Sequence, residues 1–114
     1  MRKKDYKGRC EKRILKKCKE PVRTFDMIQY AGVDYLQTCE DVQEIRCNVL
    51  LDGEADGYMT DFLCVKTNGD YMVRECVQRK YLTKPLTVKL LDISRNYWLR
   101  HGVTDWGLMI DAEK

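Results

Sequence analysis

The chain has 114 residues and a mass of 13.5 kDa, so we predict one domain over residues 1–114 and exclude a two-domain enzyme. With 44% hydrophobic residues, 34% charged residues and two prolines, the composition is that of a globular protein and excludes a disordered, collagenous or membrane chain. The net charge of +3 hides an asymmetry, because residues 1–20 carry ten Lys or Arg against three acidic residues and the remainder is mildly acidic.

The basic arm over residues 1–20 comes first in the chain. We predict that part of it, over about residues 7–19, packs as a short helix through Ile14 and Leu15. Such an arm is typical of a segment that binds phosphates, although a solvated helix would have the same charge. The candidate nucleic-acid contacts are Arg2, Lys3, Lys4, Lys12, Arg13, Lys16 and Lys17, with Lys84 added from a later loop.

The remaining elements follow Pro21. A helix is expected over residues 25–39 with Thr24 as its N-cap, then a strand over 45–51 and a polar turn over 52–57. Strands over 58–66 and 71–79 flank a glycine turn, a helix over 86–100 ends before Gly102, and 105–111 is a last strand. The predicted order is α-α-β-β-β-α-β, and we expect an α/β (α+β) fold with a mixed sheet flanked by helices.

The six cysteines are expected to be free thiols. No secretory signal is visible, which favours a cytoplasmic protein with reduced thiols. No two cysteines have the close spacing of a zinc site, and we expect neither zinc, haem nor a bound nucleotide.

The turn at Asn68-Gly69 sets the pairing of the two strands beside it. A two-residue turn would mix polar and apolar positions on both faces, whereas a three-residue turn, Thr67-Asn68-Gly69, separates them. In this second register Asp61 stands opposite Glu75 on an otherwise apolar face. Two such carboxylates need a counter-ion, so they predict either a site for Mg²⁺ or Mn²⁺ or a structural ion pair with an arginine or lysine.

Several short segments around this pair resemble the N-terminal catalytic domain of TnsA, a transposon end-cleaving endonuclease. They are Thr60-Asp61-Phe62-Leu63, Glu75, the stretch from Leu90 to Trp98, and the stretch from Asp105 to Asp111. The resemblance covers about residues 25–111. It implies the restriction-endonuclease-like fold with the PD-(D/E)xK site, and metal-dependent hydrolysis of DNA. In that family Asp61 and Glu75 would hold the ion, a lysine two positions further on would activate water, and a helix glutamate would complete the site.

Two positions depart from this family pattern. Val77 stands two residues after Glu75, where the family has lysine, and Gln29 stands where we align the helix glutamate. Lys80 or Lys84 could replace the missing lysine from the end of the strand. The candidate catalytic residues are therefore Asp61, Glu75, Lys80 and Gln29.

Three functions follow as hypotheses. The first is a nucleic-acid-acting protein of a mobile element, specifically a Mg²⁺-dependent DNA endonuclease with a degenerate site. The second is a catalytically inactive accessory protein of the same fold that binds DNA or docks a transposase or recombinase. The third is a small adaptor that uses the scaffold for protein contacts alone, whose binding would depend only weakly on salt.

Overall fold

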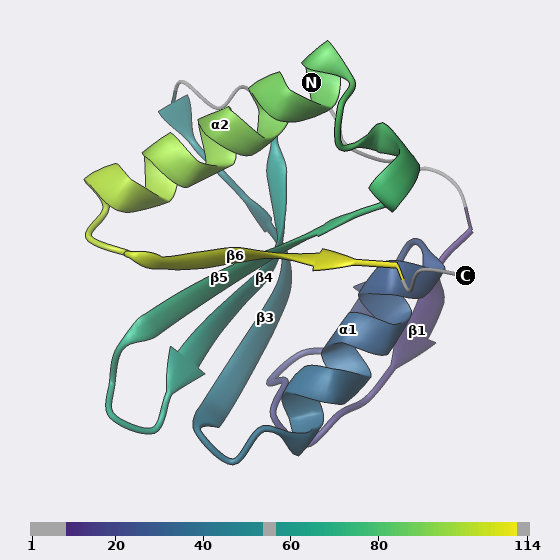
Figure 1. Cartoon of the computed structure of the whole chain (residues 1–114). Helices are drawn as coiled ribbons and strands as arrows, with labels where there is room; N and C mark the ends of the chain where they lie inside the picture. The colour runs from purple at the N-terminus through teal and green to yellow at the C-terminus, as the bar shows by residue number, and fades with distance from the viewer. Residues whose placement is uncertain (1–8, 54–56, 112–114) are drawn as a thin grey trace.

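The computed structural model describes residues 9–53 and 57–111, and its elements follow one another without long connections (Figure 1). They are β1 (Glu11–Arg13), β2 (Val22–Thr24), α1 (Met27–Thr38), β3 (Val42–Leu50), β4 (Met59–Lys66), β5 (Tyr71–Val77), the 3-10 helix η2 (Arg79–Tyr81), α2 (Pro85–Arg100) and β6 (Asp105–Ile110). Among the described residues, neither helix has the length and apolar composition needed to cross a membrane. The predicted turn over 52–57 includes residues 54–56, which lie outside the described residues.

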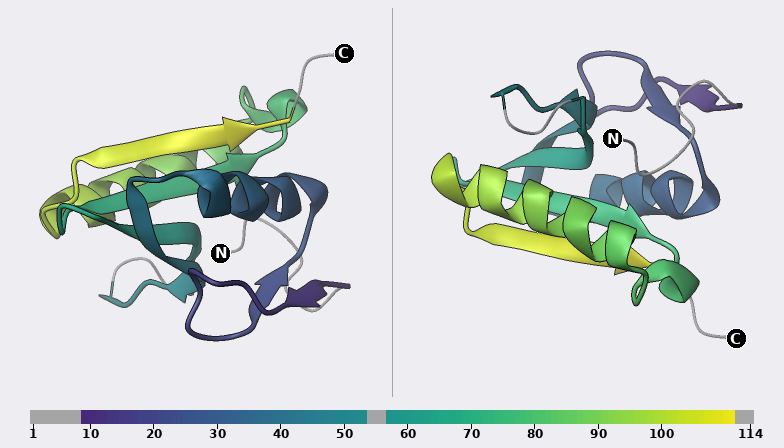
Figure 2. Two further views of the ribbon diagram at one scale, coloured as in Figure 1. Left: turned by 90° about the horizontal axis from the view of Figure 1, so that it is seen from below. Right: turned by 90° about the horizontal axis from the view of Figure 1, so that it is seen from above.

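The predicted mixed sheet is confirmed. Its strands run in the order β3-β4-β5-β6; β4 is antiparallel to β3 and to β5, and β6 is parallel to β5. A parallel pair needs a crossover connection, which α2 provides between β5 and β6. The helices α1 and α2 lie on opposite sides of this sheet (Figure 2). The α+β class and the flanking helices therefore agree with the prediction.

Each face of the sheet carries its own hydrophobic core. On the α1 side, Val33 and Leu36 pack with Ile45, Phe62 and Cys64. On the α2 side, the core comprises Leu51, Tyr58, Leu63, Val73, Leu90, Trp98 and Val103. Phe62 and Cys64 belong to one core and Leu63, between them, to the other, as the alternation of side chains in a strand requires.

The predicted register of the β4–β5 hairpin is also confirmed. Leu63 pairs with Val73 and Val65 with Tyr71, and Lys66 N donates to Asp70 O at 2.8 Å to close the turn. Gly69 has φ +92°, the left-handed conformation that this three-residue turn requires.

The helix predicted over residues 7–19 is wrong for the described part of that segment. Residues from 11 to 13 form β1, and the following loop takes its backbone partners from elsewhere: Lys17 N donates to Gln37 Oε1 at 2.9 Å and Lys17 O accepts from Ile45 N at 2.9 Å. Of the two apolar residues predicted to pack, Leu15 contacts the core on the α1 side, whereas Ile14 is 88% exposed. The observed order is therefore β-β-α-β-β-β-α-β, with the short η2 before α2.

The start of α1 differs slightly from the prediction. Thr24 ends β2 and is buried, so the N-cap is Asp26, whose side chain accepts from Gln29 N at 2.8 Å. The helix α2 has Pro85 in its first turn and ends before Gly102, which has φ +82°. The end of α2 was therefore predicted correctly.

Candidate functional site

Asp61 and Glu75 lie opposite each other where the β4–β5 ladder stops. The last backbone pair of this ladder is Phe62 with Arg74. Beyond this pair, hydrogen bonds from the backbone to the two acidic side chains join the strands. Glu75 Oε1 accepts from Asp61 N at 3.0 Å, and Asp61 Oδ2 accepts from Cys76 N at 2.7 Å. The two carboxyl groups therefore satisfy backbone N–H groups that the ladder would otherwise leave unpaired.

The second oxygen of Glu75 extends this network to α2 and β6. Ser94 Oγ donates to Glu75 Oε2 at 2.5 Å and accepts from Trp106 Nε1 at 3.0 Å. Nearby, Trp98 Nε1 donates to Thr60 Oγ1 at 2.8 Å and ties the same helix to β4. Asp61, Glu75 and Ser94 are each 0% exposed. The carboxyl pair is thus closed over by α2 and hydrogen-bonded on several sides.

In this arrangement the pair does not fit a Mg²⁺ or Mn²⁺ site. Carboxyl oxygens are the ligands that Mg²⁺ prefers, but Glu75 Oε1, Glu75 Oε2 and Asp61 Oδ2 already accept hydrogen bonds from the protein. Mg²⁺ also keeps several waters, for which completely buried side chains leave no path. Within residues 9–53 and 57–111, no group of three or more His, Cys, Asp or Glu is placed to hold an ion.

The other predicted catalytic residues lie apart from this network. Gln29, on α1, is 0% exposed; its Oε1 accepts from Phe25 N at 2.9 Å and its Nε2 donates to Asn48 Oδ1 at 2.8 Å. Lys80 is exposed in η2, with its ammonium 5.0 Å from the centre of the Tyr81 ring. Lys84 contacts the same ring at 4.6 Å. The structure thus brings Asp61 and Glu75 together and groups Lys80 with Lys84.

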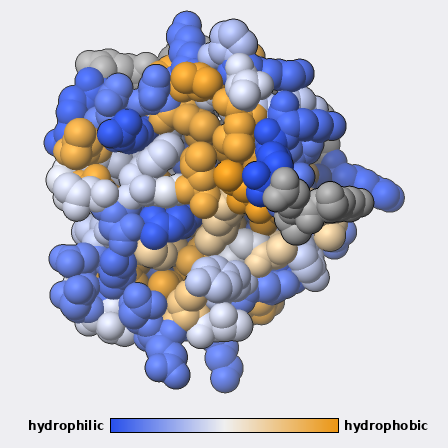
Figure 3. Space-filling view, in the orientation of Figure 1, coloured by the Kyte–Doolittle hydropathy of each residue, from blue (hydrophilic) through white to orange (hydrophobic). Residues whose placement is uncertain are grey.

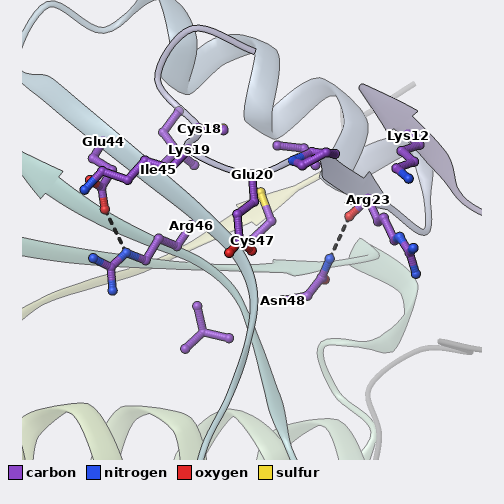
Figure 4. Close-up of a pocket in the computed structure, with 13 residues that line it drawn as sticks. Lys12, Cys18, Lys19, Glu20, Arg23, Glu44, Ile45, Arg46, Cys47 and Asn48 are labelled. Carbon is purple, nitrogen blue, oxygen red and sulfur yellow. Dashed lines mark hydrogen bonds and ion pairs between the residues drawn. The ribbon is translucent and has the colours of Figure 1, made fainter. Parts of the chain in front are cut away.

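A groove of about 730 Å³ runs between β2, β3 and the loop before β2 (Figure 4). We call it the basic groove, because its charged lining residues are the cations Lys12, Lys19, Arg23 and Arg46 and the acids Glu20 and Glu44. Lys19 and Arg46 both pair with Glu44, at 3.1 and 2.7 Å. Their hydrogen bonds, that of Arg46 first, hold the pKa of Glu44 below its usual range.

Lys12 and Arg23 stand at the other end of the basic groove (Figure 4). They are register partners in the antiparallel β1–β2 pair, and both side chains are exposed. Like charges directly opposite one another in a sheet repel. In the described part of the chain, no ion pair with an acidic side chain uses either of them. This end of the groove is therefore suited to an anion.

The basic residues predicted to contact nucleic acid are divided among several places. Arg2, Lys3 and Lys4 lie outside the described residues. Arg13 binds Asp34 at 2.7 Å and stacks over Tyr30, and Lys17 Nζ donates to Cys39 O at 2.5 Å, so both cations hold the arm against α1. Lys16 is exposed and Lys12 lines the groove.

Sequence reasoning missed three of the cations in the groove, Lys19, Arg23 and Arg46. They come from a loop and two different strands, and no spacing along the chain predicts that β1 pairs with β2. It also gave no role to Ser94, which was visible only as part of a helix motif. Only a prediction that residues 11–13 pair with residues 22–24 as a hairpin would have placed Lys12 opposite Arg23.

A second hollow, of about 590 Å³, lies between α1 and β6 and is lined mainly by apolar side chains such as Met27, Tyr35 and Leu108. On the face shown in Figure 3, hydrophobic side chains also gather in a band between α2 and β6. Leu86, Val88 and Leu108 are among the exposed hydrophobic residues of these two elements. Arg74 is the one basic residue among the described residues that line the hollow, and it is paired with Asp105 at 2.8 Å.

No model of a known protein family matches the chain, and no curated protein matches it either.

Proposed function

We propose that the chain binds nucleic acid through the basic groove and does not itself hydrolyse the phosphate backbone. This is the second of the hypotheses that the sequence raised. The observation that carries it is the facing pair of exposed cations, Lys12 and Arg23, at one end of the groove. A phosphate between them would relieve their mutual repulsion, and phosphate contacts supply most of the affinity of sequence-independent DNA binding.

The resemblance to TnsA N-terminal domains suggests the biological role and the partners in this proposal. It implies a restriction-endonuclease-like fold, an accessory role in a mobile element and a transposase or recombinase as a protein partner. The mixed sheet between two helices is compatible with that fold. A cytoplasmic location belongs to the same proposal, because DNA and reduced thiols occur together there and none of the six cysteines, all of them in the described residues, forms a disulfide.

The enclosed carboxyl pair is the reason for proposing binding without hydrolysis. Asp61 and Glu75 accept from backbone N–H groups and from Ser94, and they are completely buried. Val77, at the position of the family's lysine, is a buried strand residue with no proton to give. A phosphodiester and its attacking water would need both access and an ionisable group here.

The binding experiment uses the full chain and a fluorescently labelled DNA duplex, with anisotropy measured over a series of salt concentrations. For Lys12→Ala/Arg23→Ala, we expect weaker binding and a salt slope reduced by about 1 to 2, since each phosphate contact contributes about 0.9. The matched control is Lys89→Ala/Arg95→Ala, which removes the same charge from exposed positions on α2.

The outcomes of this experiment separate the hypotheses. An unchanged slope in Lys12→Ala/Arg23→Ala, or an equal loss in the α2 control, would show that the groove is not the binding surface. Binding of a protein partner with little salt dependence, and no DNA binding, would favour the adaptor.

Hydrolysis is the competing proposal, and the meeting of Asp61 with Glu75 across the two strands favours it. Its test is incubation of supercoiled and linear DNA with the protein in Mg²⁺, Mn²⁺ or EDTA. We expect no cleavage in any of them. Cleavage that requires the metal and is lost in Asp61→Ala would overturn the binding-only proposal.

A further inference from the structure

Two cysteines from separate segments, Cys18 and Cys47, line the wall of the basic groove. Lys17 O accepts from Ile45 N at 2.9 Å, which fixes the backbone before Cys18 beside β3. Cys47 lies two residues beyond Ile45 and therefore on the same face of β3. Both cysteines line the groove and both pack against the core on the α1 side (Figure 4).

The two thiols interact with each other and differ in character. Cys18 forms a side-chain hydrogen bond with Cys47, which is the main reason that the pKa of Cys18 falls below 9.0 while that of Cys47 rises. Arg13 lowers the pKa of Cys18 further, whereas burial and Glu44 oppose this shift. Cys18 is therefore the better nucleophile, because the thiolate is the reactive form.

Access separates this pair from the two buried cysteines, Cys64 and Cys76. Cys39 is partly exposed like Cys18 and Cys47, but it does not line the groove. Burial raises the pKa of Cys64 to about 12, which makes it unreactive at neutral pH. Cys10 is exposed and lies outside the lining of the groove.

We propose that Cys18 and Cys47 form a dithiol that hydrogen peroxide oxidises to a disulfide. The Cys18 thiolate attacks one peroxide oxygen, the O–O bond breaks, and the leaving hydroxide takes up a proton to become water. This leaves Cys18 as a sulfenic acid. The sulfur of Cys47 then attacks the sulfur of Cys18 as its own proton departs, the S–O bond breaks and a second water leaves. Two thiols and one peroxide thus give one disulfide and two waters.

The disulfide would fix the loop between β1 and β2 to β3. That loop carries Lys19, and β2 after it carries Arg23, so the cross-link holds two groove cations in place relative to Arg46. It would also close a chain loop from residue 18 to residue 47. A cross-link over a loop of this length restricts the unfolded chain and so stabilises the folded state. The oxidised protein is therefore expected to melt at a higher temperature than the reduced protein.

The experiment starts from the reduced full chain, freed of reductant and treated with a small molar excess of hydrogen peroxide. Remaining thiols are blocked, the protein is digested, and the peptides are identified by mass spectrometry without reduction. We expect a peptide pair joined through Cys18 and Cys47. The cross-link should persist in Cys10→Ser, the matched control, and be absent from Cys18→Ser. In Cys47→Ser, dimedone should trap Cys18 as the sulfenic acid, which serves as a second readout.

Two results would overturn the proposal. One is a cross-link from Cys18 to Cys39 or Cys64 in place of Cys47. The other is oxidation of Cys10 alone, with Cys18 still open to alkylation. Because these readouts involve no DNA, they test the dithiol separately from nucleic-acid binding.

Discussion

Asp61 and Glu75 each accept a hydrogen bond from the backbone of the other's strand. Glu75 Oε1 takes the N–H of Asp61, and Asp61 Oδ2 takes that of Cys76, the neighbour of Glu75. The two side chains therefore continue the pairing of β4 with β5 after the backbone ladder has ended. This arrangement makes the pair part of the sheet, and its contribution to folding can be measured.

Asp61→Ala is expected to lower the free energy of unfolding by about 2 to 4 kcal/mol, because it leaves buried donors without their acceptor. Asp61→Asn should cost less, since an amide oxygen still accepts from Cys76 N. Urea unfolding followed by circular dichroism measures both, with Asp92→Ala, at an exposed position on α2, as the control. A gain in stability for Asp61→Ala would instead indicate two repelling carboxylates, as in a metal site.

Asn48 is the one described residue other than glycine with a positive φ, +55°. Its side chain donates to Arg23 O at 2.6 Å and accepts from Gln29 at 2.8 Å, so it joins β2, α1 and β3. Asn48→Gly removes the hydrogen bonds but tolerates the positive φ, and it should cost about 1 to 2 kcal/mol. Asn48→Ala removes the same bonds and adds backbone strain of about 1 kcal/mol. Equal losses by urea unfolding would show that this strain is negligible.

Gly32 gives α1 its close approach to the sheet. A Cβ at this position would lie 2.8 Å from Met109 Sδ and 2.9 Å from Phe62 Cε2. Alanine improves helix propensity by about 1 kcal/mol, but overpacking costs about 1 to 3 kcal/mol, so we expect Gly32→Ala to be destabilising.

Thermal unfolding of Gly32→Ala alone and together with Met109→Ala tests this explanation. The clash should cost less when Met109 is shortened. The exposed neighbour Ala31, changed to glycine, reports helix propensity without a clash. A stabilised Gly32→Ala would mean that Met109 moves aside freely.

Asp105 links the start of β6 to β4 and β5 through Lys66 and Arg74. The hydrogen bond from Lys66, followed by that from Arg74, holds the pKa of Asp105 below 3.8. A carboxyl group with a lowered pKa contributes stability above its unfolded value, and this contribution disappears as pH falls through the folded value. Asp105→Asn should therefore lower the melting temperature by a few degrees at neutral pH.

The difference between Asp105→Asn and the wild type should shrink as pH falls through the lowered folded pKa of Asp105, because the wild-type carboxyl group then also becomes neutral. Lys66 behaves in the opposite sense, because Asp105 raises its pKa above 10.5. Its contribution is complete below that pH and is lost as pH rises through the higher folded value. Melting curves recorded from acid to neutral pH test the first expectation, and a difference that persists in acid would contradict it.

The strands from β3 to β6 and the pairing of β4 with β5 could be predicted, since their signals are local. Alternating apolar residues placed β4 and β5, and Gly69 set the length of the turn between them. A turn and a period of two suffice to put Asp61 opposite Glu75. The basic arm could not be predicted in this way, because its partners Tyr30, Asp34 and Ile45 are distant in sequence.

The sequence by itself thus determined the hairpin register and the meeting of two acidic side chains, because side-chain alternation and turn geometry act over a few residues. Only the tertiary structure decided what surrounds those side chains. The packing of α2 brings Ser94 onto Glu75 and encloses the pair, and the pairing of β1 with β2 sets Lys12 against Arg23 at the groove. Both depend on contacts between distant segments, whose formation follows from burial of the whole core and not from any local pattern.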